Sequence, residues 1–151
     1  MNTVDTLQAE RIDRQTDAED RVPTRPKRRR SSRSKELGRR GEEVAASFLL
    51  DRGYEIVERN WTCPAGEADI VARDGNVLVF VEVKTRSSCE KGFPAEAVTA
   101  AKRERYEKIA LMYIADCDIV DVAVRFDVVS IVVVASDRAF VRHHIGAYTA
   151  V

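Results

Sequence analysis

Two stretches of the chain repeat apolar side chains at helical spacing. Residues 35–52 do so up to Gly53, a residue type expected just past the end of a helix. Residues 95–115 repeat the spacing after Pro94, which suits a first helical position. The sequence therefore predicts two helices. The expected apolar side of the second helix consists of Val98, Ala101, Ile109 and Met112.

Between and after these helices the apolar pattern becomes that of strands. Residues 54–60, 67–73 and 77–86 alternate or concentrate β-branched side chains, as do residues 120–134, and residues 139–145 fit an additional edge strand. The order is α-β-β-β-α-β, with the extra edge strand at the end. This order predicts an α/β fold in which a single mixed sheet is flanked by helices.

The turn between the second and third strands decides which side chains share a face. Residues 74–75 are Asp-Gly, a strong hairpin signal, and a two-residue turn there pairs Asp69 with Phe80. Paired residues share a face, and the period of two places Phe80, Glu82 and Lys84 together. Asp69, Glu82 and Lys84 are therefore expected to converge. A three-residue turn would send Asp69 to the opposite face.

This convergence predicts metal chemistry. Neighbouring carboxylates repel unless a cation lies between them, and oxygen ligands suit Mg²⁺ or Mn²⁺. Lys84, on the same face as Glu82, can orient or deprotonate a metal-bound water and offset phosphate charge. Glu42 falls at the edge of the first helix's apolar stripe, whereas Glu43 points away. The expected reaction is metal-assisted phosphodiester hydrolysis.

Three members of this set, Glu42, Glu82 and Lys84, also have an ordinary structural explanation. Glu42 can be a long side chain that reaches solvent from the edge of a buried stripe. Glu82 and Lys84 can take part in common cross-strand pairs on a wet sheet face. His143 and His144 are interpreted as strand-edge residues rather than ligands, because no other ligand-type residue accompanies them.

Charge is unevenly distributed along the chain. Its 25 Lys+Arg balance 25 Asp+Glu, but residues 1–40 hold 12 basic and 7 acidic side chains and residues 41–151 hold 13 and 18. Residues 1–34 have almost no apolar periodicity, which predicts a disordered basic N-terminal arm ahead of a domain at residues 35–151. The arm is either a nucleic-acid-binding segment or a solvated tail.

Three features bear on cellular location. The longest near-apolar stretch, residues 128–135, is far shorter than the roughly 20 residues of a membrane span. Residues 1–11 lack the apolar centre of a secretory signal. Cys63, Cys89 and Cys117 have neither a disulfide pattern nor zinc-ligand spacing. We therefore expect a cytoplasmic protein with reduced thiols and no membrane partner.

Several motifs occur in a characteristic order, and they cover residues 35–148. They include Gly38-Arg39-Arg40-Gly41-Glu42, Gly66-Glu67-Ala68-Asp69-Ile70, Phe80-Val81-Glu82-Val83-Lys84-Thr85-Arg86 and Arg125-Phe126-Asp127-Val128. With these motifs the chain resembles the YraN-like family of uncharacterised bacterial proteins. That family is similar to the PD-(D/E)xK nuclease superfamily, particularly to archaeal Holliday-junction resolvases, although Ala68 stands where the superfamily name has proline. The resemblance implies a restriction-endonuclease-like core.

Matched residue by residue, the resemblance implies a role for each member of the set. It implies Asp69 and Glu82 as metal ligands and Lys84 as the catalytic lysine. It also implies Glu42 as the carboxylate on the helix that completes the metal site. Nucleic acid is the implied partner. The basic residues expected to contact it are Arg39, Arg40, Arg86 and Lys102.

Three hypotheses about function remain open. The first, which we favour, is a Mg²⁺-dependent, structure-selective DNA endonuclease that acts like a resolvase. The second is a non-catalytic nucleic-acid-binding or DNA-processing adaptor that retains the nuclease fold. The third is an enzyme acting on RNA, because the phosphodiester is the same in both polymers. Resolvase-like cutting would also require a homodimer, since two strands are cut symmetrically.

Overall fold

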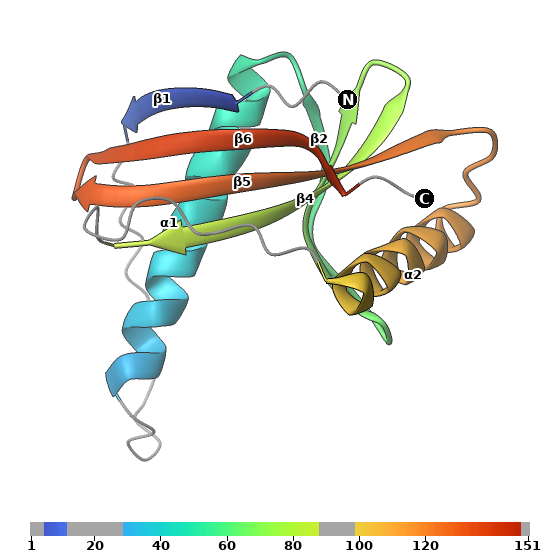
Figure 1. Ribbon diagram of the computed structural model, residues 1–151, viewed down its shortest axis with the longest axis horizontal. Coiled ribbons are helices and arrows are strands. Elements are labelled where there is room, and N and C mark those ends of the chain that lie inside the picture. Colours follow the sequence, from blue (N-terminus) through green and yellow to red (C-terminus); the bar gives the residue numbers. More distant parts are fainter. Residues whose placement is uncertain (1–4, 12–28, 88–98, 149–151) are drawn as a thin grey trace.

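The computed structural model describes residues 5–11, 29–87 and 99–148 (Figure 1). These residues form one sheet with a helix on each face. None of the helices in these ranges has the length and hydropathy to span a membrane. The elements are β1 (Asp5–Arg11), α1 (Arg29–Asp51), β2 (Glu55–Cys63), β3 (Gly66–Asp74), β4 (Val77–Arg86), α2 (Ala100–Asp116), β5 (Ala123–Ala135) and β6 (Arg138–Tyr148).

The sheet confirms the predicted mixed α/β architecture. Its strand order is β1-β6-β5-β4-β3-β2. Strands β4 and β5 are parallel, and every other neighbouring pair is antiparallel. Parallel neighbours need a crossover connection, and α2 lies in the connection between β4 and β5. The order from α1 to β6 is the one that the sequence predicts.

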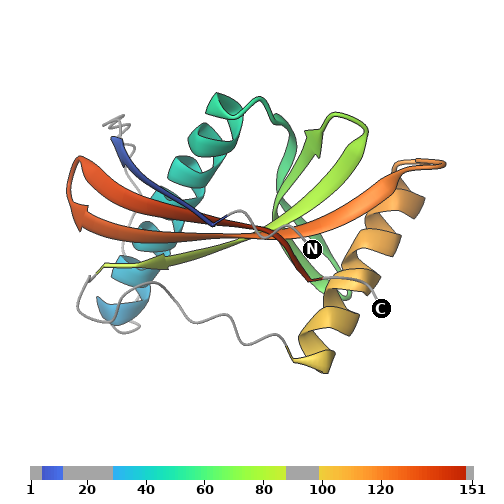
Figure 2. The same cartoon turned by 45° about the horizontal axis from the view of Figure 1, so that its top comes forward.

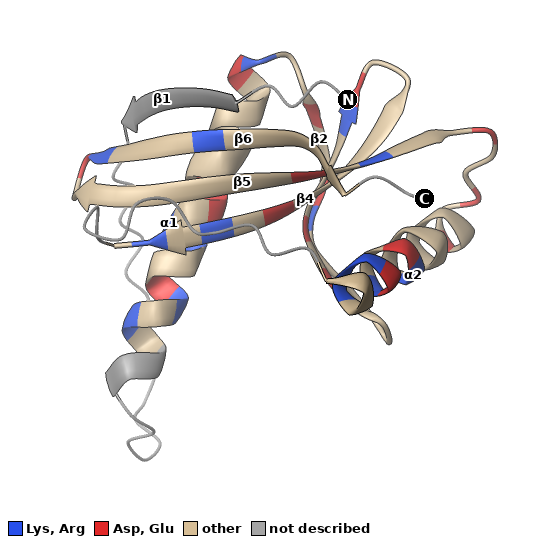
Figure 3. Cartoon of the chain, viewed as in Figure 1, with Lys and Arg blue, Asp and Glu red and all other residues tan. Residues whose placement is uncertain are grey.

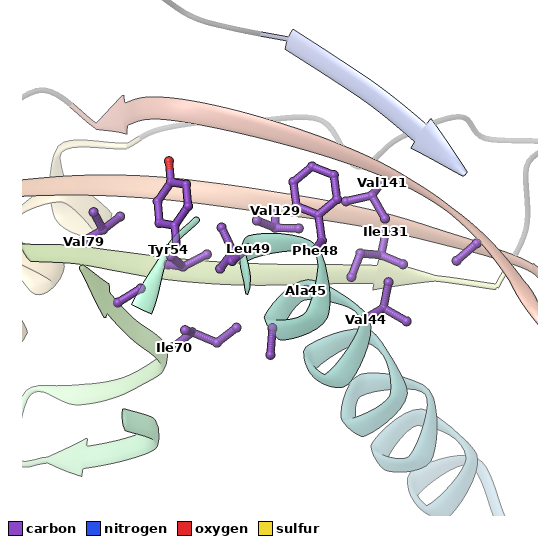
Figure 4. Close-up of a cluster of buried hydrophobic side chains, with 14 of the residues drawn as sticks. Val44, Ala45, Phe48, Leu49, Tyr54, Ile70, Val79, Val129, Ile131 and Val141 are labelled. Carbon is purple, nitrogen blue, oxygen red and sulfur yellow. The ribbon is translucent and has the colours of Figure 1, made fainter. Parts of the chain in front are cut away.

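Helix α1 packs its apolar stripe against one face of the sheet. Ala45, Phe48 and Leu49 are completely buried there, and the sheet contributes Ile70 and Ile131 to the same cluster (Figure 4). Burial of this stripe confirms the helical phase deduced from the sequence. That phase also fixes the direction in which Glu42 points.

Helix α2 packs on the other face with a set of residues that shares only Ile109 with the predicted one. Its buried side chains are Tyr106, Ile109, Ala110 and Tyr113, at the spacing of one helical face. Met112 is 40% exposed, Ala101 is exposed, and Val98 lies outside the described residues. The prediction favoured aliphatic side chains, whereas tyrosine buries a large ring and keeps its hydroxyl for a polar contact.

The hairpin between β3 and β4 is displaced by two residues from the predicted register. Asp74 pairs with Val77, so the two-residue loop is Gly75-Asn76 rather than Asp74-Gly75. Gly75 has φ of 59°, and a glycine at the first loop position favours a type II′ turn. A shift of two residues preserves parity, so Asp69 and Glu82 still belong to the same side of the hairpin.

The N-terminal part of the chain differs from the predicted disordered arm. Residues 5–11 form β1, which pairs antiparallel with β6, and α1 begins at Arg29 rather than at residue 35. Composition could not reveal β1, because its pairing depends on β6, a distant element. It could not reveal the earlier start of α1 either, because arginine is a good helix former and can extend a helix that has no apolar stripe there. The rest of the predicted arm lies outside the described residues, and its binding role stays a prediction.

Candidate active site

Strands β3 and β4 separate at one point, and Asp69 lies there. Their last paired residues are Ile70 and Val81. Past this pair the backbone N–H of Val83 donates a 2.8 Å hydrogen bond to Asp69 Oδ2, so a carboxylate replaces a backbone acceptor. Figure 2 shows β4 running away from β2 and β3 beyond this point. We call this place the strand fork.

The strand fork concentrates negative charge around Asp69. Burial raises the pKa of the Asp69 carboxyl to about 6, although the hydrogen bond from Val83 works in the opposite direction. The charges of three neighbouring carboxylates contribute to this rise, and they belong to Glu42, Glu67 and Glu82. Such a group is repulsive when all its members are ionised, and a cation would relieve the repulsion. The fork thus brings together the three carboxylates predicted for the site and adds Glu67.

Glu82 is held by two tyrosines that the sequence analysis did not single out. The hydroxyl of Tyr148 donates a 2.7 Å hydrogen bond to Glu82 Oε2. The ring of Tyr148 stacks on Tyr106 of α2, with 5.1 Å between ring centroids. Burial and the adjacent Glu82 carboxylate raise the pKa of Tyr106 well above its ordinary value. Tyr148 and Glu82 are far apart in the chain, so no local pattern could have suggested this contact.

Close packing between α1 and β4 brings Glu42 to the fork. A Cβ atom on Gly41 would lie 1.8 Å from the Thr85 hydroxyl oxygen, so glycine is needed where the helix crosses the strand. Glu42 follows directly and raises the pKa of Asp69. Glu43 instead accepts a hydrogen bond from Arg39 on the exposed side of α1. Of these two neighbours, Glu42 acts on the Asp69 carboxyl, in agreement with the helical phase, whereas Glu43 pairs with Arg39.

Lys84 extends the site along β4. It lies two residues after Glu82 and is half-buried. Alternation along the strand places Lys84 and Arg86 on the side of Glu82, whereas Thr85 faces α1. In Figure 3 acidic and basic segments follow one another along β4. The predicted lysine is therefore adjacent to the carboxylates, and its catalytic role stays a prediction.

Two of the basic residues predicted to contact nucleic acid are engaged within the protein. Arg39 donates to Glu36 at 2.8 Å and also pairs with Glu43 on the helix surface. Arg40 donates to the backbone oxygen of Ser136 at 2.8 Å, which ties α1 to the turn between β5 and β6. Nucleic-acid contact by either arginine would have to compete with these partners.

The other two predicted contacts lie on β4 and α2. Arg86 is half-buried at the end of β4. Lys102 lies in the first turn of α2, where its backbone N–H donates to the Thr99 hydroxyl at 3.2 Å. This bond is an N-cap that satisfies one of the first helical N–H groups. Contact of these residues with nucleic acid stays a prediction.

A second polar network lies on the α1 side of the sheet, around the fully buried Asp127. Its carboxylate accepts hydrogen bonds from Arg125 at 2.9 and 3.0 Å and from the backbone N–H of Gly146 at 2.9 Å. His143 Nε2 lies 2.9 Å from Asp127 Oδ2. Burial alone would raise the pKa of Asp127, but the bonds with His143, Arg125 and Gly146 leave it below its ordinary value.

This network corrects the interpretation of His143 as a strand-edge residue. Strand β6 is paired on both sides, and His143 is 1% exposed, with its ring edge-on to Phe48 and Tyr54. Arg125 extends the network by donating to the Tyr54 hydroxyl at 2.8 Å. Sequence analysis missed the network because its members are far apart in the chain. The signal present was the Arg125-to-Val128 motif, which carried no assigned role.

The donor chemistry of the strand fork fits a hard divalent cation. Asp69, Glu82 and Glu42 supply carboxylate oxygens of the kind that Mg²⁺ and Mn²⁺ prefer. In the described parts of the chain, however, no three His, Cys, Asp or Glu side chains are arranged so that they could hold a metal ion. The carboxylates are close enough to shift the pKa of Asp69 but do not converge on one point.

Comparison with known proteins agrees with the resemblance noted from the motifs. Residues 41–131 match the uncharacterised protein family UPF0102. A UPF0102 protein of Nocardia farcinica is 50% identical over 107 residues, which are 71% of this chain and 84% of the relative. One from Beutenbergia cavernae is also 50% identical over 107 residues, covering 71% and 91%. One from Geobacter sulfurreducens is 44% identical over 118 residues, covering 78% and 92%. The chain belongs to the UPF0102 family.

Proposed function

We propose that this protein is a Mg²⁺- or Mn²⁺-dependent endonuclease that hydrolyses phosphodiester bonds in branched DNA. The observation that carries the proposal is the position of Asp69 at the strand fork. Its carboxyl is half-buried, and the charges of Glu42, Glu67 and Glu82 help to raise its pKa to about 6. Carboxylates gathered in this way are unfavourable without a cation, and sites with strongly perturbed pKa values are often functional.

Each residue of the site has a distinct proposed role. Asp69, Glu82 and Glu42 would hold the metal ion, which when bound supplies Lewis-acid stabilisation of the phosphate and an activated water. The N–H of Val83 orients Asp69 through their 2.8 Å hydrogen bond. Lys84 would orient or deprotonate the attacking water. Its positive charge would also stabilise the negative charge that develops on the phosphate.

The proposed substrate rests on the resemblance to Holliday-junction resolvases. A branched DNA offers two equivalent strands, so symmetric cutting would require two copies of the chain. RNA contains the same phosphodiester, and the proposed chemistry does not depend on a 2′-hydroxyl. Branched DNA is therefore the proposed substrate, and RNA is an arm of the test.

A non-catalytic nucleic-acid-binding adaptor is the second candidate. It is favoured by the observation that the described carboxylates do not gather three ligands around one point. The excess of 18 acidic over 13 basic side chains in residues 41–151 disfavours attraction of a duplex, so the affinity of the adaptor would come from the basic residues before residue 41. On this alternative Asp69 would be a strained structural carboxylate, and binding would be independent of divalent metal.

A cleavage screen distinguishes the two candidates. Purified protein is incubated with four-way junctions, flaps, single strands and duplexes of DNA and with matched RNAs, in Mg²⁺, Mn²⁺ or chelator. The proposed nuclease cuts branched DNA only with metal, and Lys84→Ala abolishes cutting. Binding without metal-dependent cutting of any polymer would support the adaptor instead.

A further inference from the structure

The face of the sheet on the α2 side extends beyond the residues that α2 covers. Near the hairpin this face packs against α2 through Phe80, Phe126 and Val128. Further along β4, β5 and β6 the same face continues past the residues of that cluster. The strand register allows its side chains to be placed row by row.

Three rows of residues cross this part of the sheet. Register and the period of two put all their members on one face, because Val128 belongs to the α2 cluster and Val129 to the α1 cluster. The rows are Glu82–Val128–His144, Lys84–Ser130–Arg142 and Arg86–Val132–Phe140.

The rows combine cations with an exposed aromatic ring. Lys84, Arg86 and Arg142 are half-buried, so each side chain is partly accessible to solvent, although the Nε of Arg142 is buried. Phe140 is 36% exposed at the end of the third row. Among the residues that β4, β5 and β6 contribute to these rows, Glu82 is the one acidic member, and it belongs to the strand fork. In β1 the first row continues to Asp5, which pairs with His144. Figure 3 shows basic segments on β4 and β6 in the part of the sheet away from α2.

We propose that Lys84, Arg86, Arg142 and Phe140 form a surface for a single strand of nucleic acid. We call these four residues the strand-binding face. Single strands are bound by cations that follow the backbone together with aromatic rings on which bases stack. Neighbouring strands of a sheet are about 4.8 Å apart and alternate residues along a strand about 6.7 Å, so long basic side chains here can reach separate phosphates.

The position of this face explains why a nucleic acid is the occupant. Its first row begins at Glu82, so a backbone held over Lys84 and Arg142 leads directly to the carboxylates. This inference rests on the proposed function, since it names the surface by which the same site holds its substrate. An unpaired strand also suits branched substrates such as flaps, which carry a single-stranded arm.

Binding in chelator tests this surface without any cleavage. Fluorescence anisotropy of a labelled single-stranded DNA, its duplex and a matched single-stranded RNA is measured with the full chain over a series of salt concentrations. Arg142→Gln should weaken single-strand binding and reduce the slope of log affinity against log salt by about 0.7, because one phosphate contact is lost. Phe140→Ala should weaken it about tenfold with an unchanged slope, because only stacking is lost.

Matched controls remove charge or apolar surface elsewhere. Arg73→Gln removes an exposed arginine near the β3–β4 hairpin, and Leu111→Ala removes an exposed side chain from α2. Both should bind like the wild type, and all four variants should keep its melting temperature. Equal losses in Arg73→Gln and Arg142→Gln would overturn the proposal, as would a wild type that binds no single strand at low salt.

Two further outcomes separate this inference from the proposed nuclease. Single-strand binding that depends on Arg142 and Phe140, in a protein that cuts nothing, would leave the inference standing and reject the nuclease. Metal-dependent cutting with unchanged binding in both variants would reject the inference alone. Binding of the wild type to anionic phospholipid vesicles with the same dependence on Arg142, and without binding to nucleic acid, would assign the surface to membranes.

Discussion

The hydroxyl of Tyr148 donates a hydrogen bond of 2.7 Å to Glu82 Oε2 and so links the end of β6 to the strand fork. The backbone just before Tyr148 makes this contact possible. Phe126 pairs with Tyr148, but Val128 pairs with His144, so the register shifts between them. Gly146 lies in this irregularity with φ of 64°, and its N–H is bound by Asp127. The buried network therefore positions the tyrosine that orients Glu82.

Removing the Tyr148 hydroxyl should weaken metal binding. Hydrogen-bonded partners of metal ligands typically contribute about 10- to 100-fold to metal affinity. Tyr148→Phe is therefore expected to lower Mn²⁺ affinity about tenfold, measured by calorimetry, and to cost roughly 1 kcal/mol of unfolding free energy. Tyr113→Phe, which removes a hydroxyl from the same core cluster, should leave Mn²⁺ affinity unchanged. Equal Mn²⁺ affinities in all three proteins would show that Tyr148 does not orient a ligand.

Asp69→Asn should stabilise the metal-free protein at neutral pH. The pKa of Asp69 is about 6 in the folded chain and 3.8 as its ordinary value, so the folded state holds this proton more tightly. The stability associated with Asp69 is then complete below about pH 4 and is lost as the pH rises through 6. The variant should exceed the wild type by roughly 2 kcal/mol at pH 8 and match it at pH 4. Urea unfolding in chelator across this range measures the difference, and a constant difference would contradict the assignment.

Asp127 should show the opposite pH dependence. Its pKa is lowered in the folded chain, so its contribution to stability is present above about 3.8, its ordinary value, and is lost as the pH falls through the folded value. Asp127→Asn removes a completely buried partner of Arg125 and should cost about 3–5 kcal/mol at pH 7. Asp74→Asn removes the more exposed partner of the same arginine and should cost less than about 1 kcal/mol. Similar losses in both variants, measured by urea unfolding, would show that burial does not distinguish them.

Gly41 and Gly38 provide a paired test of how α1 packs. An alanine at residue 41 would place its Cβ 1.8 Å from the Thr85 hydroxyl oxygen, whereas nothing lies within 4 Å of a Cβ at residue 38. Gly41→Ala should therefore cost about 1–3 kcal/mol through overpacking. Gly38→Ala should add roughly 0.5–1 kcal/mol, because alanine is the better helix former. Thermal unfolding of the two variants checks this, and shifts in the same direction would contradict the packing at Thr85.

The hairpin shows why part of the site could be predicted. The observed loop lies one residue later than the predicted one, which shifts the pairing register by two, yet the faces of Asp69 and Glu82 agree with the prediction because side-chain direction repeats every two residues. Helical phase likewise separated Glu42 from Glu43. Periodicity therefore gives the direction of a side chain more reliably than its partner.

Contacts between distant segments could not be predicted in this way. Tyr148 contacts Glu82, which lies 66 positions earlier in the sequence, and His143 meets Asp127 across the β5–β6 pair. Neither contact leaves a periodic signal, because each depends on strand order and on a local irregularity of β6. The pairing of β1 with β6 was missed for the same reason.

The central claim is that the strand fork is a metal-dependent hydrolytic site in which carboxylates and lysine have separate roles. Its most direct test measures Mn²⁺ binding by calorimetry and cleavage of a four-way DNA junction on the same samples of wild type, Asp69→Asn, Glu82→Gln and Lys84→Ala. We predict that the wild type binds and cuts, that both carboxylate variants lose binding and cutting, and that Lys84→Ala binds Mn²⁺ but does not cut. A wild type that binds no Mn²⁺ at millimolar concentration and leaves the junction intact would contradict the claim.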